Sequence, residues 1–404
     1  MSFRLRTVRD TDELRSALGG IAHYFGWQPT DEDVERFSSV MPLERMHAVF
    51  DGGEVVAGAG VLPFEMTLPA GPTPCAGVTV VGVLPTHRRR GLLRRMMETQ
   101  LRDVRERGEP IAALWASEET IYGRFGYGLA SMTLLLDIDR HATRIRPELP
   151  REGSTRLVDK EEALRAFPRV YERVRKRSVG FLSRSPAWWE HRRLADRPEQ
   201  RRGAGPLNRA LFTRDGKPAG YATYRIAQEG STPEDWKKTV RVSEVVGVDD
   251  AAAREVWRFL LSIDWTDRVE AFDVAVDDPL LLNVDRVNKL NARMYDALWI
   301  RLVDVAAALA ARGTESRVAI EVTSDSLFPD NVGTWVVEGG VARRSTRRPD
   351  VRTDVQGLGS AFLGGFSFAQ LARSGRVEEG SRGGLARADA AFRVERAPFC
   401  PEVF

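Results

Sequence analysis

One segment constrains the fold of this chain more than any other. Residues 77–130 predict a strand, an arginine-rich glycine turn, a helix, a second strand and a tyrosine-bearing loop, in that order. The apolar strand Val78–Leu84 is followed by the turn Arg88–Gly91, and the apolar face of the next helix continues until Gly108, a predicted C-cap. Backbone N–H groups and the positive end of the helix dipole converge at such a turn. The segment therefore predicts an anion site suited to a phosphorylated cofactor.

The size and composition of the chain set limits on its class. A length of 404 residues predicts two to four domains, and we expect three. A net charge of +3 is too small to indicate a nucleic-acid partner. Cys75 and Cys400 show no metal-ligand or redox spacing, which favours a reducing compartment, the cytoplasm. No apolar run has the roughly 18 residues of a membrane span, so neither a signal peptide nor an anchor is expected.

Turn signals and periodicity divide the chain into three regions. Glycine turns at Asp51–Gly53 and at Asp215–Gly216 each join two predicted strands, and a further strand and a helix follow in both regions. The second region lacks the arginine-rich turn, so we expect a degenerate internal duplication. A charged, proline-rich linker is expected at 137–151. The predicted domains are residues 1–148, 149–293 and 294–404, and the last is predicted to be α+β.

The turn Arg88–Gly91 has the composition of a pyrophosphate site. Its glycine allows close approach of the backbone, its N–H groups can donate, and its arginines add charge-assisted bonds. Gly82, in the strand before the turn, is typical of a bulge or of a strand that a ligand approaches. The amide chain of a pantetheine arm could pair with that strand. The alternatives are a solvated basic turn and a glycine required for packing.

The loop Ser117–Tyr127 follows a buried strand and is expected near the same edge of the sheet. A tyrosine with an ordinary pKa of about 10 stays protonated at neutral pH and can return a proton to a departing thiolate. The alternative is a tyrosine that serves packing alone.

Several motifs together resemble the Eis (enhanced intracellular survival) family of N-acetyltransferases. They are VVGVLPTHRRRGLLRRM, ALWASEETIYGRFGYGLA, DPLLL, LWIRLVDVAAALAARG and an aromatic last residue. The resemblance covers nearly the whole chain. It implies an α+β and α/β fold with two tandem GNAT domains, which are mixed central sheets with flanking helices. It also implies that the second GNAT domain is catalytically empty and that the C-terminal domain is similar to sterol-carrier proteins.

The resemblance also implies the site residues. It makes Tyr122 the general acid and the terminal carboxylate of Phe404 the general base. It assigns contacts with acetyl-CoA to Val81, Gly82, Val83, Arg88, Arg89, Arg90, Gly91, Leu92, Leu93, Arg94, Ser117 and Glu118. Sequence reasoning without the resemblance gives no reason to choose a chain terminus as a base.

These expectations define a reaction. An amine would attack the thioester of acetyl-CoA directly, in a ternary complex, with backbone N–H groups near Val81–Val83 stabilising the oxyanion. The resemblance implies polycationic acceptors of the aminoglycoside kind, or lysine side chains. Acidic residues are candidates to line the acceptor cleft, with solvated surface carboxylates as the alternative: Asp31, Glu32, Asp33, Glu118 and Glu119.

Other functions remain as alternatives or are disfavoured. A non-catalytic protein that binds or senses acyl-CoA or a lipid, and a transferase for longer acyl groups, both fit the same motifs. The five histidines form no metal-ligand pattern, so no metal is expected. Neither nucleic acid nor a membrane is an expected partner. The resemblance implies a homohexamer.

Overall fold

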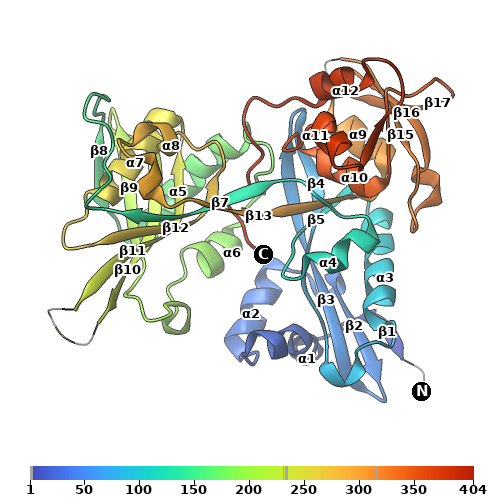
Figure 1. Cartoon of the computed structure of the whole chain (residues 1–404). Helices are drawn as coiled ribbons and strands as arrows, with labels where there is room; N and C mark the ends of the chain where they lie inside the picture. The colour runs from blue at the N-terminus through green and yellow to red at the C-terminus, as the bar shows by residue number, and fades with distance from the viewer. Residues whose placement is uncertain (1–2, 231, 233–234, 315) are drawn as a thin grey trace. The chain divides into compact units, whose positions relative to one another are not determined.

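The computed structural model describes residues 3–230, 232, 235–314 and 316–404 (Figure 1). Two compact units make up the chain. The first comprises Met1–Ser131, Ala297–Pro398 and Glu402–Phe404, and the second comprises Met132–Asp296 and Phe399–Pro401. Each unit is therefore assembled from segments that are distant in the sequence.

The first unit contains a mixed sheet with the strand order β1-β2-β3-β4-β5-β14-β6. Its neighbours are antiparallel, except that β4 and β5 run parallel. The strands are β1 (Arg4–Thr7), β2 (Met46–Asp51), β3 (Glu54–Leu68), β4 (Gly71–Val83), β5 (Ile111–Trp115), β6 (Gly128–Leu129) and β14 (Leu298–Leu302). Gly52 and Gly53, both with positive φ, form the predicted turn between β2 and β3.

Helices α1 (Thr11–Ala22) and α2 (Asp31–Val40) lie on one side of β3 and β4, and α3 (Leu92–Glu106) lies on the other (Figure 1). The N-cap of α1 is Asp10, which accepts a hydrogen bond from the Glu13 N–H. Thr30 and Asp33 form a capping box at α2. The buried face of α3 follows its helical period and packs into the core: Leu92, Met96, Met97, Gln100, Leu101 and Val104.

The C-terminal region of the first unit has its own sheet, in the order β17-β16-β15-β18-β19. Its strands are β15 (Val318–Val322), β16 (Gly333–Glu338), β17 (Val341–Ser345), β18 (Val351–Thr353) and β19 (Val377–Glu379). Its helices are α9 (Val305–Arg312), α10 (Val355–Phe362), α11 (Phe368–Arg373) and α12 (Gly384–Phe392). This part is α+β, as predicted.

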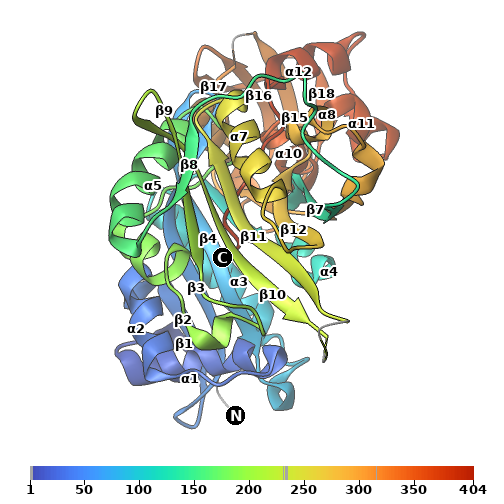
Figure 2. The same ribbon diagram turned by 90° about the vertical axis from the view of Figure 1, so that its left-hand side faces the viewer.

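The second unit repeats the sheet-and-helix plan, with the strand order β13-β7-β12-β11-β10-β9-β8 (Figure 2). The strands are β7 (Met132–Asp139), β8 (Ser154–Leu157), β9 (Asn208–Arg214), β10 (Lys217–Glu229), β11 (Lys237–Gly247), β12 (Arg268–Ala275) and β13 (Arg293–Asp296). The helices are α5 (Lys160–Arg175), α6 (Pro186–Trp188), α7 (Asp250–Leu261) and α8 (Leu280–Asn283), and the first unit adds the short α4 (Glu119–Tyr122).

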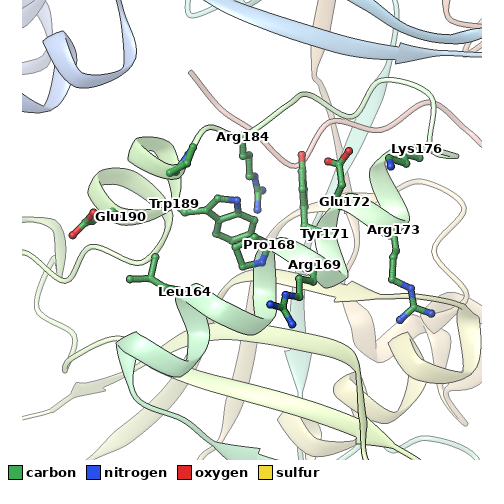
Figure 3. A pocket seen from close by; sticks show the side chains of 11 residues that line it. Leu164, Pro168, Arg169, Tyr171, Glu172, Arg173, Lys176, Arg184, Trp189 and Glu190 are labelled. Atoms are coloured by element: carbon green, nitrogen blue, oxygen red, sulfur yellow. The ribbon is translucent and has the colours of Figure 1, made fainter.

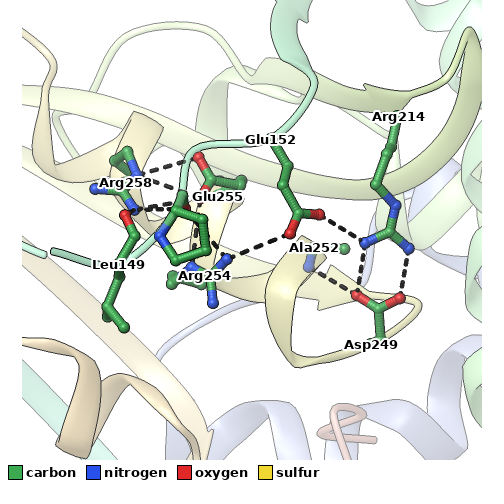
Figure 4. Close-up of polar contacts among 9 residues, drawn as sticks. Leu149, Glu152, Arg214, Asp249, Ala252, Arg254, Glu255 and Arg258 are labelled. Atoms are coloured by element: carbon green, nitrogen blue, oxygen red, sulfur yellow. Dashed lines mark hydrogen bonds and ion pairs between the residues drawn. The ribbon is translucent and has the colours of Figure 1, made fainter.

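Ion pairs attach the segment before β8 to α7 (Figure 4). Arg214 Nη1 lies 3.0 Å from Glu152 and 3.2 Å from Asp249. Arg258 reaches the carboxylate of Glu255 and the carbonyl oxygen of Leu149 at 3.1 and 3.3 Å. The predicted linker at 137–151 therefore begins inside a strand and ends in a segment held by several arginines.

The pairing partners of two strands, β7 and β14, could not be predicted from sequence periodicity. β7 pairs with β12 and β13 in the sheet of the second unit. β14 follows the second unit in sequence, yet it pairs with β5 and β6 in the first sheet. Residues 298–302, which the sequence analysis placed in the third region, thus complete the first sheet. No helix in the described part of the chain is both long and apolar enough to cross a bilayer.

Candidate active site

The parallel strands β4 and β5 separate at one point in the first sheet. Among the described residues, they pair only where Cys75–Gly77 meets Ile111–Ala113. β4 then continues to Val83 and remains paired with β3 alone, while β5 continues to Trp115 and pairs with β14. The backbone of β4 from Val78 onward therefore has no strand partner on the β5 side. An extended chain of amide groups can hydrogen-bond to such an edge.

A β-bulge lies in the same stretch of β4. Its register against β3 shifts between Gly58 and Gly60, which pair with Gly82 and Thr79. Val80 takes a φ of 49°, which is strained for a β-branched residue. Bulges reorient neighbouring backbone groups and often occur beside active sites. The bulge thus redirects the backbone at Val81–Val83, the residues predicted to contact the thioester.

Gly82 also has a packing role. A Cβ atom on Gly82 would lie 2.5 Å from the Gly20 carbonyl carbon, and one on Gly20 would lie 2.9 Å from the Gly82 carbonyl oxygen. Neither position has room for a methyl group, because the obstacle is backbone. The packing alternative for Gly82 is therefore correct, and it leaves the backbone of Gly82 available to a ligand.

The two adjacent glycines of α1 provide a matched pair of mutations. We expect Gly20→Ala to lower the free energy of unfolding by about 1–3 kcal/mol, because overpacking against a backbone strains both elements. Gly19→Ala is the control, since no atom lies within 4 Å of a Cβ placed there. It should leave stability unchanged or raise it by about 0.5–1 kcal/mol through helix propensity. Urea unfolding of the two variants checks this prediction, and equal stability would contradict it.

The turn before α3 has the features of an anion site. Arg89 and Gly91 have positive φ values of 62° and 76°. Gly91 is the N-cap of α3 and supplies no capping side chain, so the first N–H groups of the helix are not satisfied by a cap. The turn itself is exposed, whereas Leu92 is buried and anchors it to the core. This geometry permits backbone donors and the helix dipole to meet a phosphate group.

The arginines of the turn are exposed at the surface. Within the described part of the chain, Arg88, Arg89, Arg90 and Arg94 take part in no ion pair, although Arg88 lies over Tyr24 and Arg90 over Phe3, each 5.9 Å from the ring centre. These guanidinium groups therefore remain available for charge-assisted bonds to an anion.

Tyr122 ends the short helix α4 and is 7% exposed. It packs in an apolar cluster with Val78, Met97 and Tyr127, among others. Burial raises the pKa of Tyr122 to about 12, so the phenol is protonated at neutral pH. Ser117 and Glu118 are exposed directly after β5, and the Glu118 carboxylate accepts a hydrogen bond of 2.6 Å from the Thr120 hydroxyl.

The last residue of the chain lies where β4 and β5 separate. The Phe404 ring makes an edge contact with Phe64, with ring centres 5.2 Å apart. A Cβ atom on Gly77, the last residue of β4 that pairs with β5, would lie 3.2 Å from the Phe404 ring. Because Glu402 and Cys400 are buried, this tail is docked against the protein. The only sequence signal for it is a weak one, the apolar residues near the terminus.

The predicted acidic residues differ in their surroundings. Burial alone would raise the pKa of Asp33, but hydrogen bonds from Thr30 and the charge of Arg36 outweigh it and lower that pKa. Asp33 therefore has a structural role in the capping box of α2. Asp31 is exposed and pairs with Arg15, while Glu118 and Glu119 are exposed at the start of α4. No group of histidine, cysteine, aspartate and glutamate suited to a metal ion occurs among the residues that the structure describes.

Comparison with known proteins identifies the family. Residues 4–130 and 180–302 match two models of acetyltransferase (GNAT) domains, and residues 305–401 match a sterol carrier protein domain. N-acetyltransferase Eis of Mycobacterium tuberculosis is 34% identical over 89% of this chain and 90% of its own length. The chain belongs to the Eis family of N-acetyltransferases.

Other members of the Eis family and its relatives agree with this. An uncharacterized N-acetyltransferase of Streptomyces avermitilis is 36% identical over 97% of this chain and 96% of its own. The crystal structure of Eis1 from Mycobacterium abscessus superposes with a TM-score of 0.85 at 32% identity, covering all of both chains. The predicted tandem GNAT domains with a sterol-carrier-like domain are confirmed, and so is the prediction of an N-acetyltransferase. GNAT acetyltransferases use acetyl-CoA and an amine acceptor.

In the second GNAT region of this Eis-family chain, the parallel strands β11 and β12 correspond to β4 and β5, and their surroundings differ. β11 and β12 are also parallel, and they pair over Thr239–Val242 and Arg268–Ala271. The small cavity beside them, about 30 Å³ in volume, is lined in part by Phe399. The Phe399 N–H donates to the Val179 carbonyl at 3.0 Å, and its ring packs 5.9 Å from that of Phe181. A residue of the C-terminal tail thus lines the cavity beside these two parallel strands.

The N-terminus of α7 also differs from that of α3. Its N-cap is Asp249, whose carboxylate accepts from the Ala252 N–H and pairs with Arg214. A carboxylate at this position satisfies the helix N-terminus and repels a phosphate. The N-terminus of α7 therefore lacks the uncapped N–H groups found at α3.

The second unit contains a larger cavity of about 860 Å³, beside α5 and α6 (Figure 3). Arg184 is one of the residues that line it, and its guanidinium lies over the rings of Tyr171 and Trp189, 3.7 and 4.6 Å from their centres. None of the predicted site residues lines this cavity.

Proposed function

We propose that this protein transfers the acetyl group of acetyl-CoA to an amine of a polycationic small molecule of the aminoglycoside kind, or of a lysine side chain, in a ternary complex. The observation that carries the proposal is the position of Phe404 against Gly77, where β4 and β5 separate. It puts the last residue of the chain beside the strand edge that suits a pantetheine arm. The bare N-terminus of α3 and the arginines of its turn support binding of the pyrophosphate.

Each side chain has a defined task in this mechanism. When bound, acetyl-CoA supplies a thioester whose carbonyl carbon accepts the amine nitrogen while the C–S bond breaks. The Phe404 carboxylate takes a proton from the acceptor ammonium, directly or through water, because only the neutral amine attacks. Backbone N–H groups at Val81–Val83, reoriented by the bulge, stabilise the negative charge on the carbonyl oxygen. Tyr122 donates its proton to the departing sulfur, and no covalent enzyme intermediate is needed.

Replacing Tyr122 by phenylalanine tests the proposal. We expect Tyr122→Phe to lower kcat for CoA release by about 100-fold with kanamycin-like and diamine acceptors, because general acid catalysis contributes roughly 10²–10⁴-fold. The KM for acetyl-CoA should stay unchanged, since the hydroxyl acts on the leaving group. Tyr224→Phe, at a tyrosine of β10 in the second unit to which no role is assigned, is the control. Wild-type turnover in Tyr122→Phe would exclude Tyr122 as the acid.

We also propose a homohexamer in the cytoplasm. Apolar side chains are exposed along β12, α8 and β13 of the second unit: Phe272 (53%), Leu282 (78%), Met294 (60%) and Tyr295 (44%). Exposed apolar residues that gather on consecutive elements are typical of subunit interfaces. Cys75 and Cys400 are both buried and are not joined in a disulfide, which favours a reducing compartment. The mass of the protein in solution tests the assembly, and a monomer would exclude it.

A further inference from the structure

Three polar atoms without partners lie in the core of the first unit. They are the Tyr127 hydroxyl and the Nε and Nη1 atoms of Arg301, and none has a hydrogen-bond partner among the described residues. Both side chains are 0% exposed. Native proteins pair nearly all buried polar groups, so unpaired ones require an explanation. Here a phenol and a guanidinium are left with donors that no group uses.

Both side chains adjoin the loop that carries Tyr122. The Tyr127 and Tyr122 rings are in edge contact, with centres 6.0 Å apart, and the Tyr127 N–H donates to the Tyr122 carbonyl at 3.3 Å. The Arg301 guanidinium packs against Gly126, where a Cβ atom would lie 2.9 Å from Nη1. The side chains that carry the unused donors thus contact the loop of the proposed general acid.

Asp325 fixes the direction in which the Arg301 donors point. Nη2 of Arg301 donates to both carboxylate oxygens of Asp325 at 2.7 Å. Asp325 also accepts from the Leu327 N–H and the Asn331 amide, at 3.0 and 2.8 Å, so it cannot turn away. One end of the guanidinium is therefore occupied, and Nη1 faces the loop at Gly126.

The high pKa of Tyr122 makes it a weak acid for a departing thiolate. A free thiol has a pKa of about 8.5, and burial raises the pKa of Tyr122 to about 12. Protonation of the departing thiolate by Tyr122 is therefore unfavourable unless the tyrosinate is stabilised. Stabilisation requires a hydrogen-bond donor or a positive charge beside the phenol oxygen. Tyr127 and Arg301 are groups of that kind in contact with the loop.

We propose that Tyr127 and Arg301 are positioning residues for Tyr122. The Tyr127 hydroxyl donates a hydrogen bond, directly or through one water, to the Tyr122 oxygen as the proton of Tyr122 leaves. Arg301 polarises the Tyr127 hydroxyl. This rests on the proposed role of Tyr122. The transferred proton passes from the Tyr122 oxygen to sulfur, and Tyr127 keeps its own. Tyr122 then regains a proton equivalent to the one that the acceptor amine has released. Cys75 is a further titratable group near Tyr127, and Asp325 pairs with Arg301.

Tyr127→Phe removes the hydroxyl alone and provides the test. We expect it to lower kcat for CoA release about tenfold, with the KM for acetyl-CoA and the melting temperature unchanged, because the hydroxyl has no partner to lose in the resting protein. In a Tyr122→Phe background, the same change should have no further effect, since residues that act through one another are not additive. Tyr224→Phe, at a buried tyrosine of the second unit, is the control.

A second variant removes the cation without leaving a buried charge. Arg301→Met combined with Asp325→Asn neutralises both partners, and the asparagine oxygen can still accept from the backbone. We expect the same tenfold loss, absent again in the Tyr122→Phe background. An equal loss of kcat in both backgrounds, or full activity of Tyr127→Phe, would overturn the inference. Full activity of Tyr122→Phe itself would instead overturn the proposed function, so the two failures are distinct.

Discussion

One glycine appended after Phe404 is expected to lower kcat for CoA release by about 100-fold at neutral pH. The added residue moves the only α-carboxylate of the chain away from the point where β4 and β5 separate, and a positioned general base contributes roughly 10²–10⁴-fold. The aromatic ring can stay on Phe64, so the fold is expected to be unchanged. Steady-state assays with saturating acetyl-CoA and a diamine measure the effect.

A substitution at the same position separates the carboxylate from the ring. Phe404→Leu keeps the terminal carboxylate and loses the edge contact with Phe64. We expect it to lower kcat far less than the added glycine does. If the two variants lose activity equally, the ring is what matters, and the carboxylate is not the base. If neither loses activity, the tail has no part in the reaction.

The second large effect concerns a buried carboxylate in the second unit. Glu244 is 6% exposed and accepts from Arg184, from Arg193 at 2.7 Å and from the Tyr221 hydroxyl at 2.9 Å. The side chain of Arg184 is 0% exposed. Glu244→Leu would remove the buried carboxylate that Arg184, Arg193 and Tyr221 share, and removing one partner of a buried ion pair typically costs about 3–5 kcal/mol. We expect a loss of that size in the free energy of unfolding, measured in urea.

An exposed glutamate of the same sheet is the matched control. Glu229 pairs with Arg241 at 3.3 Å and its side chain is 68% exposed, so Glu229→Leu should change stability by no more than about 1 kcal/mol. A similar small change in Glu244→Leu would show that solvent or another group replaces the carboxylate.

The contribution of Glu244 to stability should also depend on pH. Burial alone would raise its pKa, but the charges of Arg184 and Arg193 outweigh it and lower the pKa from 4.5 to about 2. A lowered folded-state pKa means that the contribution is complete above the unfolded value and is lost as pH falls through about 2. The stability difference between wild type and Glu244→Gln should therefore be larger at pH 7 than at pH 3. An equal difference at both pH values would contradict the assignment.

The sequence by itself determined the local parts of the candidate site. Helical period and the C-cap glycine predict α3, and the turn Arg88–Gly91 is exposed at the start of α3 as expected. These features depend on residues a few positions apart, so their pattern is visible in one dimension. The resemblance to the Eis family, which the relatives confirm, supplied the fold and the type of enzyme. It also suggested Tyr122 and Phe404, whose roles stay predictions.

Only the tertiary structure decided which distant residues meet. Strand β14 completes the first sheet, Gly82 packs on the backbone at Gly20, and Phe404 reaches Gly77 across more than three hundred residues of chain. Phe399 packs in the second unit by a similar long-range contact. Such contacts depend on shape and burial summed over whole sheets. The residue pattern of one segment therefore does not identify the segment with which it will pack. Local hydrogen bonding thus sets the elements, and packing between remote segments brings the proposed acid, base and anion turn into one unit.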